Sequence, residues 1–553
     1  MRLSKLKIAF LAGVMRLGSP MVAAPGSQLS PQRLNQVRRA MVTTTESGTN
    51  ITQAYNACEQ WDEIMVDADN LPENIRGICY ALQASTRARL GQDALAVDSY
   101  RSCLKLKSQL SEDTIYDATM GKAFALQRLM KYNEASLTFL ECDTERACIG
   151  AVTCLLRLDD VHRAEKVLCN FKRTHQDSIE TEALLGILLL MRSRTNDDKI
   201  EAARFLSRSC DKSPLYRFAY AVATKTDSLA STSSQKSFGS LDLASVNRSP
   251  FDDPMLIHLD DKIYLHKMLT NSTQSPTFWP KGFVLLNDVQ ELKIYLTDDE
   301  SNDSTQIMWI LKQRAGYGSH GNTLVSKKEL MEWCKRDDND SEGILCQKLV
   351  APPLLLNGHK FSIRVYVVYF PGMSEQTPEV HLSDMGLVKL ASLPFEHNAV
   401  NDDRIHMTNS GREAEMSQCD LNVLKSKFDD AGWSYSKVWT SIRDSVLQVM
   451  QVYLRFAKEQ QTHQIQSVGK LGIPKILGFD YIVDANRRPF LLEVNRFPGL
   501  EPRDANDTVV KRAVVLSAWA LAYNRLGLDA QESHRSVDED VERCSFERLI
   551  PLT

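Results

Sequence analysis

The sequence predicts a multidomain protein in which an all-α region of helical repeats is followed by an α+β domain. Residues 50–222 form successive helical patterns with almost no strand pattern, whereas strand-like and helical runs alternate beyond residue 250. A Ser-rich stretch between them predicts a linker. We therefore expect an N-terminal tail at 1–48, a helical repeat domain at 49–223, a linker at 224–250, an α+β domain at 251–528 and a polar tail at 529–553.

The composition is that of an ordinary globular protein of 553 residues, 43% hydrophobic and 25% charged. A net charge of -4, without any run of five basic residues, argues against a nucleic-acid partner. The twelve cysteines include no CxxC pair and no Cys/His grouping at zinc spacing, so we expect buried, reduced thiols. No apolar stretch reaches the ~20 residues of a membrane span.

The N-terminal tail carries a weak targeting pattern. It has a basic start and an apolar stretch from Ile8 to Met15, which Arg16 interrupts. A cytoplasmic location is the prediction, and a secretory or organellar location stays open.

Within the helical region, three segments share one pattern. They read LGQDALAVDSY, LMKYNEASLTF and LDDVHRAEKVL, and each has an alanine at its seventh position and a large residue at its eleventh. The segments begin at Leu90, Leu129 and Leu158, and a fourth helix pair is expected to end near KIEAARFL. Their offsets of 39 and 29 residues bracket the tetratricopeptide period of about 34. The region is therefore TPR-like, with a generic helical bundle as the alternative, and its concave face is expected to bind a protein ligand.

The stretch GFDYIVDANRRPFLLEVN, residues 478–495, predicts a hairpin whose turn is centred between Asn486 and Arg487. That register puts Asp480 across from Glu493, with Asn495 and Leu491 on the face of Glu493. Two carboxylates and an amide oxygen on one face form a set of ligands suited to Mg²⁺. The alternative is an ordinary hairpin with one solvated face.

A second strand, HKFSIRVYVVYF, places Lys360, Ser362, Arg364 and Tyr366 on one face. Cations on an otherwise apolar strand are costly unless anions meet them, which predicts an anion site. An amphipathic edge strand with bases that reach solvent is the alternative.

In the segment WILKQRAGYGSHGN, Lys312 is followed by three glycines, of which Gly316 is the first. The backbone N–H groups of this glycine-rich stretch could form an anion-binding nest. It matches neither the Walker nor the dinucleotide-binding pattern. The tetrapeptide HMTN, which begins at His406, is by itself best interpreted as a polar loop.

Taken in order, these motifs resemble those of the tubulin-tyrosine ligase family of ATP-grasp enzymes over about residues 251–525. The resemblance rests on YLHKMLTNSTQSPTFWPKGFVL, the Lys312 loop, CQKLVAPPLLLNGHKFSIRVYVV, GLVKLA, HMTN, LGFDYIVD and LLEVNRFPGLEP. It implies an ATP-grasp fold for the C-terminal domain, with ATP and Mg²⁺ as cofactors.

The resemblance also assigns roles to individual residues. Lys312 and Lys348 would contact ATP phosphates, within a nucleotide site that includes Gly316. Gln347 and Leu349 would hold the adenine, and Lys360 would contact the nucleotide. Magnesium would be held by Asp480, Glu493 and Asn495. The catalytic residues would be Arg364, which would bind the carboxylate of a free amino acid, together with Lys389 and Glu493.

The activity implied is ATP-dependent ligation of Tyr, Glu or Gly to a carboxylate of tubulin or of another protein with an acidic tail. That activity would place the chain in the cytoplasm, at microtubules or cilia. Two departures stand against it, because the family usually has Asp where this chain has Ser362 and Arg where it has Lys389. Two other hypotheses therefore stay open: a ligase with a different substrate, and a TPR-like adaptor whose ATP-grasp domain only binds.

Overall fold

The computed structural model describes most of the chain in sixteen stretches. These are residues 31–46, 51–193, 195–210, 212–224, 251–271, 276–285, 287–298, 307–314, 322–335, 344–371, 377–396, 403–408, 418–460, 471–501, 505–528 and 544–549. The chain divides into two compact units: 1–154 with 282–348, and 155–281 with 349–553. The predicted targeting segment and nearly all of the predicted linker lie outside the described residues.

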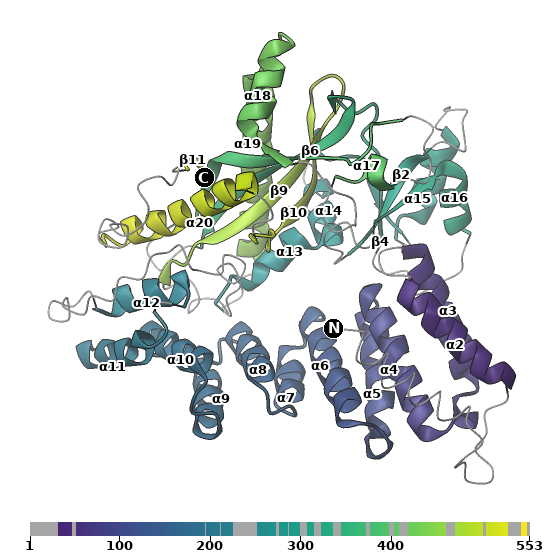
Figure 1. Cartoon of the computed structure of the whole chain (residues 1–553), viewed down its shortest axis with the longest axis vertical. Coiled ribbons are helices and arrows are strands. Elements are labelled where there is room, and N and C mark those ends of the chain that lie inside the picture. The colour runs from purple at the N-terminus through teal and green to yellow at the C-terminus, as the bar shows by residue number, and fades with distance from the viewer. Residues whose placement is uncertain are drawn as a thin grey trace. The chain divides into compact units, whose positions relative to one another are not determined.

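The first unit joins helices to a small antiparallel sheet of order β1-β4-β2-β3, of which Figure 1 labels β2 and β4. Its helical part comprises α2 (Pro31–Glu46), α3 (Ile51–Val66), η1 (Ala68–Asn70), α4 (Glu73–Arg89), α5 (Asp93–Lys105), η2 (Lys107–Gln109), α6 (Glu112–Arg128) and α7 (Tyr132–Phe139), and it contains most of α8 (Glu145–Arg157). The later elements are β1 (Gly282–Val284), α15 (Val289–Asp298), β2 (Ile307–Gln313), β3 (Asn322–Ser326), α16 (Lys327–Trp333) and β4 (Ile344–Lys348). Cys58 and Leu90, from the helical part, pack into the same hydrophobic cluster as Phe283 and Trp309 of the sheet.

The second unit is built on a seven-stranded antiparallel sheet of order β10-β9-β6-β7-β11, with β5 paired to β6 and β8 to β7. Its strands are β5 (Leu355–Leu356), β6 (His359–Phe370), β7 (Glu379–Leu390), β8 (Gln418–Asp420), β9 (Lys475–Val483), β10 (Pro489–Asn495) and β11 (Phe546–Leu549). Its helices are α9 (Val161–Thr174), α10 (Ile179–Arg192), α11 (Asn196–Ser207), α12 (Pro214–Thr224), η5 (Pro254–Leu256), α13 (Ile257–Asp260), α14 (Lys262–Thr270), α17 (Asp403–His406), α18 (Leu421–Asp430), α19 (Tyr435–Gln460) and α20 (Ala505–Arg525). The fold class predicted from the sequence, helical first and α+β second, is confirmed.

The three repeat segments adopt one local geometry. In each, the second residue is left-handed (Gly91, Met130 and Asp159, with φ between 55° and 79°), and a helix begins two residues later. The alanine at the seventh position and the large residue at the eleventh are fully or almost fully buried in all three. The predicted helix pairs therefore exist, and their assignment to the TPR class stays an interpretation.

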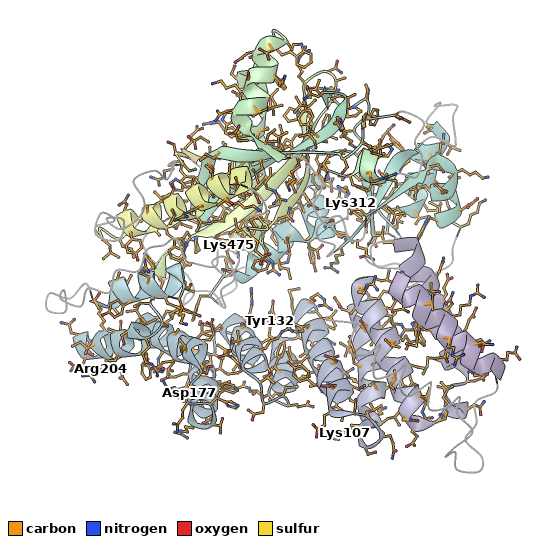
Figure 2. All side chains as sticks on the ribbon, viewed as in Figure 1. Lys107, Tyr132, Asp177, Arg204, Lys312 and Lys475 are labelled. Carbon is orange, nitrogen blue, oxygen red and sulfur yellow. The ribbon has the colours of Figure 1, made fainter. Side chains whose placement is uncertain are left out.

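The start of the α+β domain is fixed to the large sheet by two consecutive carboxylates. Asp252 pairs at 2.6 Å with Lys475, the first residue of β9, which is labelled in Figure 2. Asp253 Oδ2 accepts hydrogen bonds from the hydroxyls of Tyr369 and Tyr453 at 3.1 and 2.9 Å. Burial raises the pKa of Asp253, although these donors and the Met255 backbone N–H oppose the rise.

The expectation of buried, reduced cysteines is met in part. All twelve cysteines are free thiols, eight of them buried and four half-buried. Within the described stretches, no helix is both long enough and apolar enough to traverse a bilayer.

Candidate active site

A row of charged and polar side chains crosses four neighbouring strands of the large sheet. The register places Lys389 of β7 opposite Ser362 of β6, Arg364 of β6 opposite Asp480 of β9, and Asp480 opposite Glu493 of β10. Ser362 and Arg364 are two residues apart, so they share one face of the sheet. The row brings together residues that are more than 120 positions apart in the sequence.

The centre of the row is a buried ion pair. Nε and Nη2 of Arg364 each donate a hydrogen bond to one carboxylate oxygen of Asp480. Lys389 Nζ lies 3.9 Å from the same carboxylate. Burial opposes ionisation of Asp480, but the charges of Arg364 and Lys389 outweigh it and hold the pKa of Asp480 below its usual value. Asp480 is 1% exposed, so the alternative of a solvated hairpin face is wrong.

Glu493 and Asn495 complete this end of the row. The amide nitrogen of Asn495 donates to Asp480 Oδ2 at 3.3 Å and to Glu493 Oε1 at 3.2 Å. The other carboxylate oxygen of Glu493 lies 3.5 Å from Nζ of Lys262, a buried residue of α14. Sequence reasoning missed Lys262, because a lysine at the start of a short helix carries no pattern that points to a strand 231 residues away.

The predicted hairpin register holds only on one side of a bulge. Asp480 pairs with Glu493 and Gly478 with Asn495, as expected, but nearer the turn Tyr481 pairs with Leu491. The extra residue, Leu492, changes which side chains face the core. Leu491 therefore lies on the buried face rather than on the face of Glu493, and that part of the prediction is wrong.

β6 is an internal strand, paired to β9 on one side and to β7 on the other, so the edge-strand alternative for its basic residues is wrong. Burial lowers the pKa of Lys360 to about 8. Burial, together with repulsion from Arg364, lowers that of Lys389 to about 8 as well. No described residue forms an ion pair with Lys360.

Ser362, which departs from the family pattern, is bound by a neighbouring motif. The hydroxyl of Thr408, from HMTN, donates a hydrogen bond to Ser362 Oγ at 2.6 Å. Both residues are buried. The contact shows that HMTN reaches the charged row, although Asn409 lies outside the described residues.

Gly478 leaves room for the guanidinium of Arg364. A Cβ at this position would lie 2.9 Å from Arg364 Cδ and 2.9 Å from Pro498 Cβ, closer than real Cβ contacts allow. The backbone of β9 therefore approaches Arg364 as only glycine permits.

The remaining predicted residues lie mostly in the first unit, where β2 pairs with β4. Lys312 Nζ donates a hydrogen bond to Gln347 Oε1 at 2.6 Å, and both residues are buried. Lys312 is labelled in Figure 2. Lys348 Nζ lies 3.5 Å from the hydroxyl of Tyr295. Leu349 is half-buried in the second unit, and Gly316 lies outside the described residues.

The carboxylate oxygens of Asp480 and Glu493 suit a magnesium ion, whereas Asn495 turns its amide nitrogen toward them, so its oxygen would become a ligand only after the amide rotates. In the described part of the chain, no three His, Cys, Asp or Glu side chains form a metal-binding group, so the candidate consists of two carboxylates and one amide. Mg²⁺ often keeps few protein ligands and completes its shell with water and phosphate oxygens. The buried ammonium of Lys360 likewise fits a phosphate, which would supply the charge that it lacks.

Comparison with known proteins assigns this domain to a family. The tubulin-tyrosine ligase family matches residues 244–519. These residues form a tubulin-tyrosine ligase domain. The match contains both strands of the hairpin, all of β6 and β7, and Lys262.

Individual relatives of the ligase domain are distant. The chain is 28% identical over 231 residues to human "Tubulin polyglutamylase TTLL13", which covers 39% of this chain and 27% of the relative. It is 25% identical over 299 residues to "Tubulin polyglutamylase ttll6" of Danio rerio, covering 52% and 36%. It is 26% identical over 256 residues to "Tubulin polyglutamylase ttll-4" of Caenorhabditis elegans, covering 44% and 40%. The matches thus span less than half the length of these relatives.

Proposed function

We propose that this chain is an ATP-dependent ligase that joins glutamate to a carboxylate of tubulin or of another protein with an acidic tail. The observation that carries the proposal is the row of charge from Lys389 to Glu493, within a domain of a ligase family. Microtubules or cilia are the location that this substrate would imply.

The proposed reaction has two steps. An acceptor carboxylate oxygen attacks the γ-phosphorus of ATP, which forms an acyl phosphate and releases ADP. The amine of the incoming amino acid then attacks the acyl carbon, an amide bond forms, and inorganic phosphate leaves. Magnesium, when bound, offsets negative charge on the transferred phosphoryl group.

The residues of the row have distinct proposed roles. Asp480, Glu493 and Asn495 hold the metal, and Lys360 neutralises a phosphate. Arg364 binds the amino-acid carboxylate: its Nε and Nη2 donate to Asp480, and no described residue accepts from Nη1. A planar guanidinium held in this way is already oriented for a second carboxylate. In the first unit, Lys312 and Lys348 are proposed to contact the phosphates, with Gly316 part of the nucleotide site, and Gln347 and Leu349 to hold the adenine.

We propose glutamate as the added amino acid for two reasons, which are the excess of cations in the row and the names of the relatives. With Ser362 neutral, Lys360, Arg364 and Lys389 provide three cations beside the two carboxylates of Asp480 and Glu493 in this row. Glutamate brings two carboxylates, whereas tyrosine and glycine bring one each. The relatives above are named polyglutamylases.

Mass spectrometry tests the proposal directly. Tubulin would be incubated with the full chain, ATP, Mg²⁺ and a mixture of Tyr, Glu and Gly, and its C-terminal peptides analysed for added residues. Glutamate additions that require ATP are the expected result. Additions of tyrosine or glycine would refute the choice of amino acid. An inactive chain that still binds ATP would favour the adaptor hypothesis, for which the neutral Ser362 is the supporting observation.

A further inference from the structure

We propose that Lys262 is a positioning residue whose ammonium holds the Glu493 carboxylate in place, so that the carboxylate pair of the hairpin is set for a divalent cation before that cation binds. The proposal rests on the proposed function for the identity of the cation. It assigns Lys262 no contact with substrate.

The geometry gives each oxygen of Glu493 its own polar partner. Oε1 accepts from the amide of Asn495 at 3.2 Å, and Oε2 faces Lys262 Nζ at 3.5 Å. The side chains of Lys262 and Glu493 are 5% and 12% exposed, so water screens their attraction poorly.

The position of Lys262 is fixed by the local fold of α14. The preceding residue, Asp261, caps the helix by accepting hydrogen bonds from the backbone N–H groups of Ile263 and Tyr264, both at 3.0 Å. Lys262 is therefore the first residue of a capped helix, and its backbone is held on both sides.

The charge of Lys262 offsets a repulsion between two carboxylates of the hairpin. Asp480 and Glu493 lie directly opposite each other, where like charges destabilise a sheet. Arg364 hydrogen-bonds Asp480, and Lys262 supplies a cation on the side of Glu493. Each carboxylate thus lies beside a cation in the absence of metal.

The test is a double-mutant cycle in the full chain, read as melting temperature with and without Mg²⁺. The variants are Lys262→Met, Glu493→Gln and their combination, with Lys267→Met, an exposed lysine of the same helix, as control. We expect K262M to melt several degrees below the wild type in metal-free buffer, and Mg²⁺ to recover most of that loss because the ion replaces the missing charge. Adding E493Q to K262M should also raise the melting temperature, while K267M should match the wild type.

Two results would overturn the proposal. One is a decrease in the melting temperature of K262M that neither Mg²⁺ nor E493Q changes. That result would mean that Lys262 makes only a packing contact between α14 and β10. The other applies if K262M does not fold: the double variant should then fold, and its failure to do so refutes the role. Because the cycle needs no catalysis, a wild type that lacks ligase activity would refute the proposed function and leave this inference standing.

Discussion

Lys360 is the residue whose environment most clearly requires a ligand. It lies on an internal strand, burial lowers its pKa to about 8, and no described residue pairs with its charge. At neutral pH the folded chain therefore keeps a buried ammonium that is less favourable than it is in the unfolded chain. Below pH 8 this cost is fully present, and it disappears as the pH rises from about 8 toward the lysine's ordinary value of 10.5.

This lysine predicts a pH dependence of nucleotide binding. A bound phosphate favours the charged form of Lys360, so the affinity for ATP should fall about tenfold between pH 7 and pH 9. Lys360→Met should bind ATP weakly without this pH dependence, and without nucleotide it should be more stable at pH 7 by up to about 3 kcal/mol. Calorimetric titration and thermal melts check both, with Lys437→Met, exposed on α19, as the control. Because the pKa of Lys389 is also about 8, Lys389→Met is measured in parallel, and a pH dependence that persists in K360M but disappears in K389M would contradict the assignment.

Gly478 permits a prediction about Arg364. A methyl group at Gly478 would collide with Arg364 Cδ, so Gly478→Ala should displace the guanidinium from Asp480. We expect ligation to fall more than tenfold, because misplaced reacting groups are costly, with a higher KM for the amino acid. Gly499→Ala is the matched control, since a Cβ there meets nothing within 4 Å. Equal activity of the two variants would show that Arg364 needs no such space.

Glu493→Gln tests the metal role at the same site. The substitution removes one anionic ligand at nearly constant volume, and metal stabilisation of a transferred phosphoryl is worth several kcal/mol, so ligation should be abolished. The metal-free chain should melt lower as well, because Lys262 loses its partner. Acceptor labelling and circular dichroism measure the two effects. An active, folded variant would exclude Glu493 as a metal ligand.

At the scale of elements, the sequence patterns predicted the features that depend on residues close together in the sequence. The repeat segments were recognisable because an alanine and a large residue recur at fixed positions, and all of these residues are buried. The hairpin was recognisable from its turn and from alternation, which correctly paired Asp480 with Glu493. The charged strand β6 followed from the same period-two pattern, and the fold class followed from the change from helical to mixed patterns beyond residue 250.

The elements that could not be predicted depend on distant contacts. The bulge at Leu492 is stable because Leu491 and Val494 both then face the core, which the sequence of the hairpin alone does not require. The segment expected to be a polar tail contains β11, which pairs with β7. Its register depends on Ser383 and Leu382, more than 160 residues earlier. Lys262 and Thr408 reach the charged row in the same long-range way.

The helix pairs make a packing prediction. The eleventh residues of the first two segments, Tyr100 and Phe139, pack over glycines of the following helix: a Cβ at Gly121 would lie 2.5 Å from Tyr100, and one at Gly150 would lie 2.8 Å from Phe139. Gly121→Ala should destabilise the chain by about 1–3 kcal/mol through overpacking. Denaturant unfolding would measure this, and the loss should shrink when Tyr100→Leu accompanies it. Additive effects of the two substitutions would rule out direct crowding.

At the scale of the whole molecule, the chain crosses between its compact units three times. The first unit takes residues 1–154 and 282–348, and the second takes the rest. The helical region contributes to both units: Leu90 packs with the small sheet in the first, and the Phe218 ring lies 5.5 Å from Trp519 of α20 in the second. Helices predicted as a separate domain thus share cores with the α+β region.

Independent folding of the helical region stays a prediction, and the structure adds that the isolated region should be less stable than the full chain. We expect residues 50–225 alone to give a helical circular dichroism spectrum, since most of their buried contacts are between successive helices. Their melting temperature should lie below that of the full chain, because Cys58 and Leu90 lose the sheet that covers them. A spectrum without helix would show that the sheet is required for folding.

The shared cluster around Leu90 also has a consequence for synthesis of the protein. On the ribosome, α3 and α4 emerge early, yet β4, the last strand of the sheet that covers Cys58 and Leu90, ends at Lys348, roughly 260 residues later. At translation rates of about 5–20 residues per second, this part of the nascent chain stays uncovered for roughly 10–50 s. Throughout that interval the emerging helices offer an apolar surface to chaperones, and neighbouring ribosomes on one message would hold several such surfaces close together.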